Sequence, residues 1–218
     1  MKLAALTSGG KDSILAIQKA IDEGHTVTHM ITVVPENKES YMFHSANLSA
    51  VRIMAERAGM EYLEIPTAGE KEAEIADMQE GIRGLDTGGL IVGAIASTYQ
   101  RERVEAVCKA LRLSVFAPLW GMTPDDVVAE VASKMDARIV VTAADGLGEN
   151  VLGKKIDEDL IRVLKAVEKK RRIHIAGEGG EYESLVFNAP FFSSPVKAEG
   201  METHFEGMVG KVTYRRFW

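Results

Sequence analysis

The sequence predicts an α/β fold: a doubly wound parallel sheet in the first half, followed by a smaller C-terminal α+β portion. Strand-like and helix-like segments alternate through residues 3–117, and the strand segments at 26–34 (TVTHMITVV) and 89–95 (GLIVGAI) are almost continuously apolar or β-branched. Such strands, separated by helices, are typical of a parallel sheet covered on both faces. After Pro118 the alternation stops, which indicates a second portion of different architecture.

Breaker residues separate the elements of the first half. Gly24 and Gly59 follow the first two helical segments, and Pro35, Pro66 and Pro118 follow strand-like runs, as expected at the ends of such elements. The expected strands are 3–6, 26–34, 61–65, 89–95 and 114–117, and the expected helices are 12–23, 47–58, 70–82 and 97–111.

The second half mixes helices with strands that are not separated by helices. Expected helices are 124–134 and 157–168, and expected strands are 137–142, 172–176, 182–187, 196–205 and 211–217. We therefore divide the chain into residues 1–118 and 119–218, and expect the second portion to pack against the carboxyl end of the first sheet.

Composition excludes several classes of protein. The 218 residues are 46% hydrophobic and 27% charged, with a net charge of −6 and no basic tract longer than residues 169–172, so we expect no nucleic-acid partner. The single cysteine, Cys108, excludes an internal disulfide and a multi-cysteine metal site, and its helical spacing from Val104 and Leu111 predicts burial. No apolar run approaches the roughly 18 residues of a membrane span, so we expect a cytoplasmic protein with no membrane partner.

The segment Thr7-Ser8-Gly9-Gly10-Lys11-Asp12-Ser13 stands between the first strand and the first helix. The first N–H groups of a helix have no internal partner, and the helix dipole is positive there, so this position suits an anion. The loop is not a Walker A motif, because Asp12 follows Lys11 where Ser or Thr is required. It also lacks the third glycine of a dinucleotide-binding fingerprint.

Residues 8–13 (SGGKDS) instead resemble the S-G-G-x-D-S loop of ATP pyrophosphatases, which cleave ATP between the α- and β-phosphates. The resemblance implies an adenine nucleotide alpha hydrolase-like, Rossmann-like fold that binds ATP. Backbone N–H groups at Gly9 and Gly10 and hydroxyls around them would contact phosphates. Lys11 would offset developing charge, and Asp12 would orient Mg²⁺ or a water.

In a sheet of this kind the ligand lies at the carboxyl ends of the strands, where the connection direction reverses. Small residues at the end of the fourth strand, Gly93, Ala94 and Ser97, would leave room for adenosine, and the backbone of Val33 on the second strand would contact the adenine edge. Close packing of a helix on the sheet is an equally good interpretation of Gly93 and Ala94.

Longer stretches resemble the diphthine–ammonia ligase family: residues 93–105 (GAIASTYQRERVE), 118–120 (PLW), 178–184 (EGGEYES) and 42–44 (MFH). The resemblance implies adenylation of the carboxylate of diphthine on translation elongation factor 2, followed by attack of ammonia to give diphthamide, AMP and pyrophosphate. No second domain with a cysteine nucleophile is present to hydrolyse glutamine, so ammonium is the expected nitrogen source. The loop 146–153 departs from the family because it lacks a tryptophan often found there.

The acidic segment is expected on the substrate side of the cleft. Glu178, Glu181 and Glu183 would act in catalysis, and Glu181 and Glu183 would share one face of a strand. An acidic, aromatic-lined pocket suits ammonium and the trimethylammonium group of diphthine, and metal binding is the alternative role. Further expected substrate-binding residues are His44, Asn47, Tyr99, Gln100, Arg103, Trp120 and Tyr182.

Two other functions share the ATP-binding loop. A tRNA-modifying ATP pyrophosphatase would want a basic groove, which the net charge of −6 disfavours. A nucleotide-binding regulatory module would hold ATP without turnover.

Overall fold

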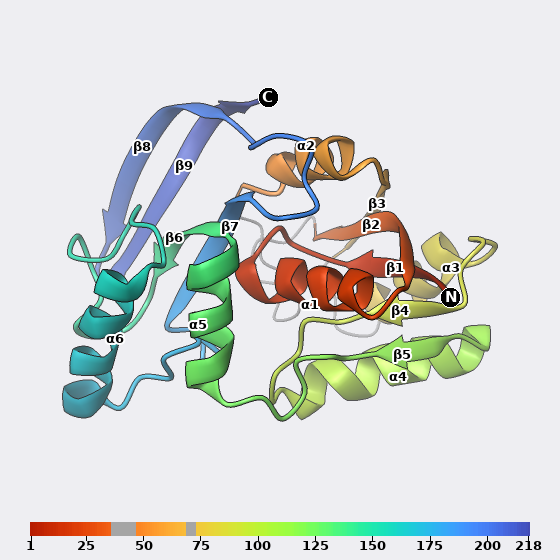
Figure 1. The fold of residues 1–218 in the computed structure, drawn as a ribbon, viewed down its shortest axis with the longest axis horizontal. Coiled ribbons are helices and arrows are strands. Elements are labelled where there is room, and N and C mark those ends of the chain that lie inside the picture. The colour runs from red at the N-terminus through yellow and green to blue at the C-terminus, as the bar shows by residue number, and fades with distance from the viewer. Residues whose placement is uncertain (36–46, 69–72) are drawn as a thin grey trace.

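The first half of the chain forms a five-stranded parallel sheet with strand order β3-β2-β1-β4-β5. The computed structural model describes residues 1–35, 47–68 and 73–218 (Figure 1). The order reverses beside β1, which has β2 on one side and β4 on the other. The strands are β1 (Lys2–Leu6), β2 (Thr26–Pro35), β3 (Glu61–Thr67), β4 (Gly89–Ile91) and β5 (Ser114–Phe116), and the helices are α1 (Lys11–Asp22), α2 (Ser49–Ala58), α3 (Ala73–Ile82) and α4 (Thr98–Leu111).

Alternate residues of β1 face opposite layers, as expected for a strand covered on both sides. Leu3 and Ala5 join the core under α1 and α2, whereas Ala4 and Leu6 join the core under α3 and α4. This arrangement confirms the predicted doubly wound α/β fold. Cys108 is 1% exposed in the second of these cores, so its predicted burial is also confirmed.

The second half forms a four-stranded antiparallel sheet with order β7-β6-β9-β8, together with two helices. This is the predicted α+β portion. Figure 1 shows α5 standing between α1 and α6, so that the second half packs on the α1 side of the first sheet. Its elements are α5 (Pro124–Lys134), β6 (Asp136–Thr142), α6 (Glu158–Arg171), β7 (Tyr182–Asn188), β8 (Ala198–Glu206) and β9 (Val209–Phe217).

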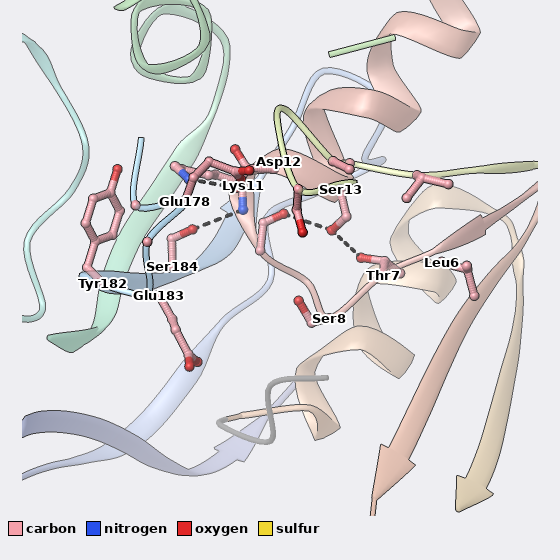
Figure 2. A pocket seen from close by; sticks show the side chains of 18 of the residues that line it. Leu6, Thr7, Ser8, Lys11, Asp12, Ser13, Glu178, Tyr182, Glu183 and Ser184 are labelled. Atoms are coloured by element: carbon pink, nitrogen blue, oxygen red, sulfur yellow. Dashed lines mark hydrogen bonds and ion pairs between the residues drawn. The ribbon is translucent and has the colours of Figure 1, made fainter. Parts of the chain in front are cut away.

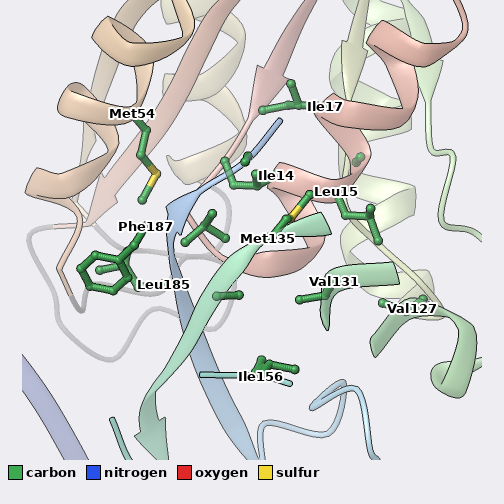
Figure 3. Close-up of a cluster of buried hydrophobic side chains, with 14 of the residues drawn as sticks. Ile14, Leu15, Ile17, Met54, Val127, Val131, Met135, Ile156, Leu185 and Phe187 are labelled. Carbon is green, nitrogen blue, oxygen red and sulfur yellow. The ribbon is translucent and has the colours of Figure 1, made fainter. Parts of the chain in front are cut away.

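One hydrophobic cluster joins the two halves (Figure 3). Leu15 and Ile17 of α1 are fully buried and belong to the same cluster as Val131 of α5 and Leu185 of β7. Helix α1 therefore contributes apolar surface to a core that the second half completes. No helix in the described ranges is both long enough and apolar enough to cross a bilayer.

Two predicted strand ends and one predicted strand are wrong. The strand expected at 89–95 ends at Ile91, where the chain turns into the site described below. Pro66 does not end its strand, because β3 is the edge strand of the sheet, where a missing N–H is tolerated. Residues 172–176 form no strand but lead into a turn. The start of the helix expected at 70–82 falls outside the described residues.

Asn47 connects the start of α2 to the second half. Its side-chain Nδ2 donates to the carbonyl of Val212 at 2.9 Å, and its Oδ1 accepts from the N–H of Tyr214 at 3.2 Å, both on β9. Its backbone has φ 60°, a left-handed conformation that asparagine tolerates better than most residues. The predicted substrate-binding residue thus serves as a link between α2 and β9.

Asn47→Ala should lower the free energy of unfolding by about 1–3 kcal/mol, because it strains the backbone and leaves two β9 groups without their partner. Urea denaturation followed by circular dichroism measures this change. The control is Asn150→Ala, since the Asn150 amide bonds Gly146 and Gly148 within its own exposed loop. An equal loss in both variants would contradict a linking role for Asn47.

Candidate active site

A cavity of about 470 Å³ lies where the order of the parallel strands reverses. Three segments enclose it: the loop from β1 into α1, the chain after β4, and the turn that leads into β7 (Figure 2). The third segment comes from the second half of the sequence. The lining residues are Leu6, Thr7, Ser8, Gly10, Lys11, Asp12, Ser13, Val92, Gly93, Ala94, Ser97, Tyr99, Val104, Gly177, Glu178, Gly179, Gly180, Tyr182, Glu183 and Ser184.

Hydroxyl groups hold the loop between β1 and α1 in shape. The Thr7 hydroxyl accepts from the N–H of Gly9 at 2.9 Å and lies 2.7 Å from the Ser13 hydroxyl, which in turn donates to the carbonyl of Gly10 at 3.0 Å. Gly9 has φ 79°, which favours glycine. The Gly9 N–H is therefore engaged inside the loop, whereas Gly10 and Ser8 line the cavity.

The loop is also bonded to β7. The carbonyl of Gly9 accepts from the N–H of Val186 at 2.9 Å, and the N–H of Lys11 donates to the Ser184 hydroxyl at 3.1 Å. Ser184 thereby satisfies an N–H group at the start of α1 that has no partner within the helix. Its place in the 178–184 motif was the only sign of it in the sequence.

Gly93 is required by packing. A Cβ at this position would lie 2.6 Å from the N of Ser13 and 2.7 Å from the carbonyl carbon of Asp12, in the first turn of α1. Ala94 is buried, and both residues line the cavity together with Ser97. Small residues here let α1 approach the end of β4, so the packing interpretation of Gly93 holds. Val33 is buried in β2 and is not part of the cavity lining.

The side chain of Lys11 points into the junction between the halves. Its ammonium lies 2.7 Å from Oδ2 of Asp12, donates to the carbonyl of Ala176 at 2.5 Å, and lies 5.2 Å from the centre of the Tyr182 ring. Burial alone would lower its pKa, but the charge and hydrogen bond of Asp12 and the charge of Glu178 outweigh burial and raise it. Lys11 is therefore charged and already engaged.

Glu178 brings a second carboxylate to the cavity. Its Oε2 accepts from the N–H of Ala96 at 3.3 Å, which places the turn against the segment after β4. Burial and the nearby charge of Asp12 raise the pKa of Glu178. Glu183 also lines the cavity. A cavity lined by the N-terminus of α1 and by carboxylates can hold an anion and a cation side by side.

The Glu181 carboxylate holds a turn of the backbone together. Its Oε1 accepts from the N–H of His174 at 2.7 Å and its Oε2 from the N–H of Gly179 at 2.9 Å, so it holds the turn of residues 174–181 closed. It precedes β7 and is not part of the cavity lining. The expected strand face shared with Glu183 is therefore wrong, because β7 begins one residue later.

The aromatic residues expected near the substrate divide into two groups. Tyr182 lines the cavity, donates its hydroxyl to the carbonyl of Ile175 at 2.8 Å, and has its pKa raised to about 12 by burial. Tyr99 also lines the cavity, with the Arg103 guanidinium 4.0 Å from its ring centre. Trp120 is not part of the lining and carries Arg101 over its ring at 4.4 Å. His44 and the side chain of Gln100 lie outside the described part of the structure.

Gly10→Ala tests whether phosphate approaches the loop backbone. Gly10 has φ −76°, and an added Cβ would lie 3.4 Å from the nearest atom, the carbonyl oxygen of Ser184, which is ordinary contact. We expect unfolding by urea to be unchanged and ATP affinity, measured by calorimetry, to fall at least about tenfold, since a methyl group would occupy the space of a phosphate oxygen.

Gly93→Ala is the comparison, because it must push back the first turn of α1 and should lower both stability, by about 1–3 kcal/mol, and ATP affinity. Gly148→Ala is the control, since the nearest atom to its Cβ would be 3.8 Å away. Unchanged ATP affinity in Gly10→Ala would contradict the hypothesis that the phosphates of ATP bind at this loop.

Glu178→Gln tests the cost of the half-buried carboxylate. A folded-state pKa raised above the ordinary value of 4.5 means that Glu178 contributes stability below about pH 4.5 and loses it as pH rises through the folded pKa. The melting temperature of Glu178→Gln relative to the parent should therefore increase from pH 4.5 to pH 7.5. In scanning calorimetry Glu56→Gln, an exposed change on α2, should follow the parent at each pH. A constant difference for Glu178→Gln would contradict the raised pKa.

Comparison with known families covers almost the whole chain. The diphthamide synthase N-terminal domain matches residues 1–115, and the diphthamide synthase C-terminal domain matches residues 123–217. The boundary between them lies in the connection between β5 and α5.

Named relatives agree with this assignment. The diphthine–ammonia ligases of Bos taurus and Homo sapiens are each 32% identical over 243 residues, covering 100% of this chain and 91% of the relative. The diphthine–ammonia ligase of Schizosaccharomyces pombe is 31% identical over 98% of this chain, which spans 38% of that longer protein. With both domains matched in order and relatives aligned from end to end, the chain belongs to the diphthine–ammonia ligase family.

Proposed function

We propose that this chain catalyses the ATP-dependent amidation of diphthine on translation elongation factor 2. The observation that carries the proposal is the composition of the cavity, in which an ATP-pyrophosphatase-type loop and the carboxylate-bearing turn of residues 174–181 meet. The relatives named diphthine–ammonia ligase support it.

The proposed reaction has two steps. A carboxylate oxygen of diphthine attacks the α-phosphorus of ATP, and the bond to the β-phosphate oxygen breaks to release pyrophosphate. Ammonia then attacks the acyl carbon of the acyl-adenylate, AMP leaves with the shared oxygen, and the nitrogen loses a proton to give the amide. Ammonium must give up one proton before it can attack, so the second step needs a group that accepts it.

The residues of the cavity suit these steps. Gly10 and the N-terminus of α1 would face the phosphates, where the helix dipole favours negative charge. Glu178 and Glu183 come from the segment that closes the cavity beside the loop, and they suit a cation, either ammonium or the trimethylammonium group of diphthine.

Asp12 is the residue that fits Mg²⁺. Asp12 lines the cavity, and its Oδ1 is buried and forms no hydrogen bond within the described residues, so one carboxylate oxygen is left for a ligand. Among those residues no group of three or more His, Cys, Asp or Glu side chains could hold a metal. Mg²⁺ is commonly held by one or two carboxylates together with substrate phosphates and water. When bound, the ion would neutralise part of the phosphate charge, and Asp12 would orient it.

Incubation with ATP, ammonium and diphthine-bearing elongation factor 2 should yield AMP and pyrophosphate in equal amounts with the amide. The reason is that attack is proposed at the α-phosphorus. Nucleotides are measured by chromatography, pyrophosphate by a coupled assay, and the modified peptide by mass spectrometry. Omission of the elongation factor is the control.

Each alternative gives a different result. Stoichiometric ADP and phosphate would contradict adenylation. Turnover stimulated by tRNA and not by the elongation factor would identify a tRNA-modifying enzyme. ATP binding without turnover in the complete mixture would identify a regulatory module.

A further inference from the structure

We propose that Lys11 is a positioning residue that fastens the turn of residues 174–181, and with it the Glu178 carboxylate, to the phosphate loop. In this role it does not bind the phosphates of the nucleotide. The catalytic consequence rests on the proposed function, whereas the structural part does not.

The contacts of Lys11 leave its ammonium little capacity for a phosphate. The side chain is 4% exposed. An ammonium has three N–H donors, and here Asp12 and the Ala176 carbonyl accept from it while the Tyr182 ring lies beside it. To bind a phosphate, Lys11 would have to break one of these contacts in a buried site.

The turn needs an external anchor. The Glu181 bonds to His174 and Gly179, and the Tyr182 bond to Ile175, fix the shape of the turn but not its place on the first half. Side-chain contacts among the described residues help to fix its place: Lys11 donates to the Ala176 carbonyl at 2.5 Å, and Glu178 accepts from the Ala96 N–H at 3.3 Å. The Lys11 contact is the shorter, and its donor is charged, which strengthens a hydrogen bond.

A charged group in this position is costly unless it is used. A buried ion pair is often no more stabilising than apolar residues of similar volume, and the neighbouring residues of α1 that point inward, Ile14 and Leu15, are apolar. Lys11 reaches from the phosphate loop to a carbonyl two residues before Glu178. One side chain thus sets the distance between the wall that holds the nucleotide and the wall that holds the carboxylate.

Lys11→Met is the principal test, since methionine has similar length and no charge. Hydrogen exchange measured by mass spectrometry should show that the backbone amides of residues 174–181 exchange at least about tenfold faster than in the parent. ATP affinity should stay within about threefold of the parent, and kcat for amide formation should fall at least about 100-fold, as expected when a reacting group is misplaced.

Lys19→Met is the matched control. Lys19 also lies on α1 and also reaches the second half, through an ion pair with Glu130 of α5 at 2.7 Å, but it does not line the cavity. It should leave exchange in residues 174–181, ATP affinity and kcat unchanged. Lys11→Gln, which keeps an N–H donor, should restore part of the protection.

Outcomes separate the inference from the proposed function. Loss of ATP binding in Lys11→Met with unchanged exchange in the turn would make Lys11 a phosphate ligand and overturn the inference, and so would unchanged exchange together with unchanged kcat. The exchange and affinity measurements need no diphthine, so they stand even if no amide is formed by the parent.

A measurement on the unmutated chain covers the case in which the variants do not fold. With ¹⁵N-labelled lysine, the Lys11 ammonium should show slowly exchanging protons whose NMR signal shifts little on ATP addition. A large shift, as for a group that gains a phosphate contact, would overturn the inference.

Discussion

The site depends on the bonding of the phosphate loop to β7. Parallel sheets of this order usually present their loops to solvent at the switch point. Here the Gly9 carbonyl and the Lys11 N–H instead pair with Val186 and Ser184 of the second sheet. The loop therefore lies alongside β7 and is hydrogen-bonded to it. The acidic turn leads directly into β7, so these bonds bring it close to the loop, and the side-chain contacts of Lys11 and Glu178 fix its place there.

The site carries charge that the fold alone does not need. Lys11 is buried with Asp12 beside it, and Glu178 has a raised pKa because it is desolvated near another carboxylate. Apolar side chains would fill this volume at lower cost. The large shared core, in which Leu15 and Val131 are fully buried, offsets that cost.

Local patterns in the sequence predicted the sheet, the helices and the loop, because periodicity and breaker residues act over a few neighbours. They could not separate the three glutamates of the 178–183 segment. Glu181 closes a turn through backbone N–H groups, which depends on how residues 174–180 fold back. The burial of Lys11 depends on a carbonyl 165 residues away. Pro66 was predicted to end its strand, because the local sequence does not show that this strand lies at the edge of the sheet, where proline is tolerated.

The shared core has a consequence for synthesis. Residues 1–117 emerge from the ribosome first and contain every strand of the parallel sheet, but α1 also packs against α5 and β7, which follow later in the chain. Until those elements follow, Leu15 and Ile17 lack part of their packing, and the Gly9 carbonyl lacks its strand neighbour. The nascent first half is therefore an incomplete folding unit that exposes apolar surface, and such surface favours aggregation. The two matched regions share one hydrophobic core, which is complete only after the second region has been synthesised.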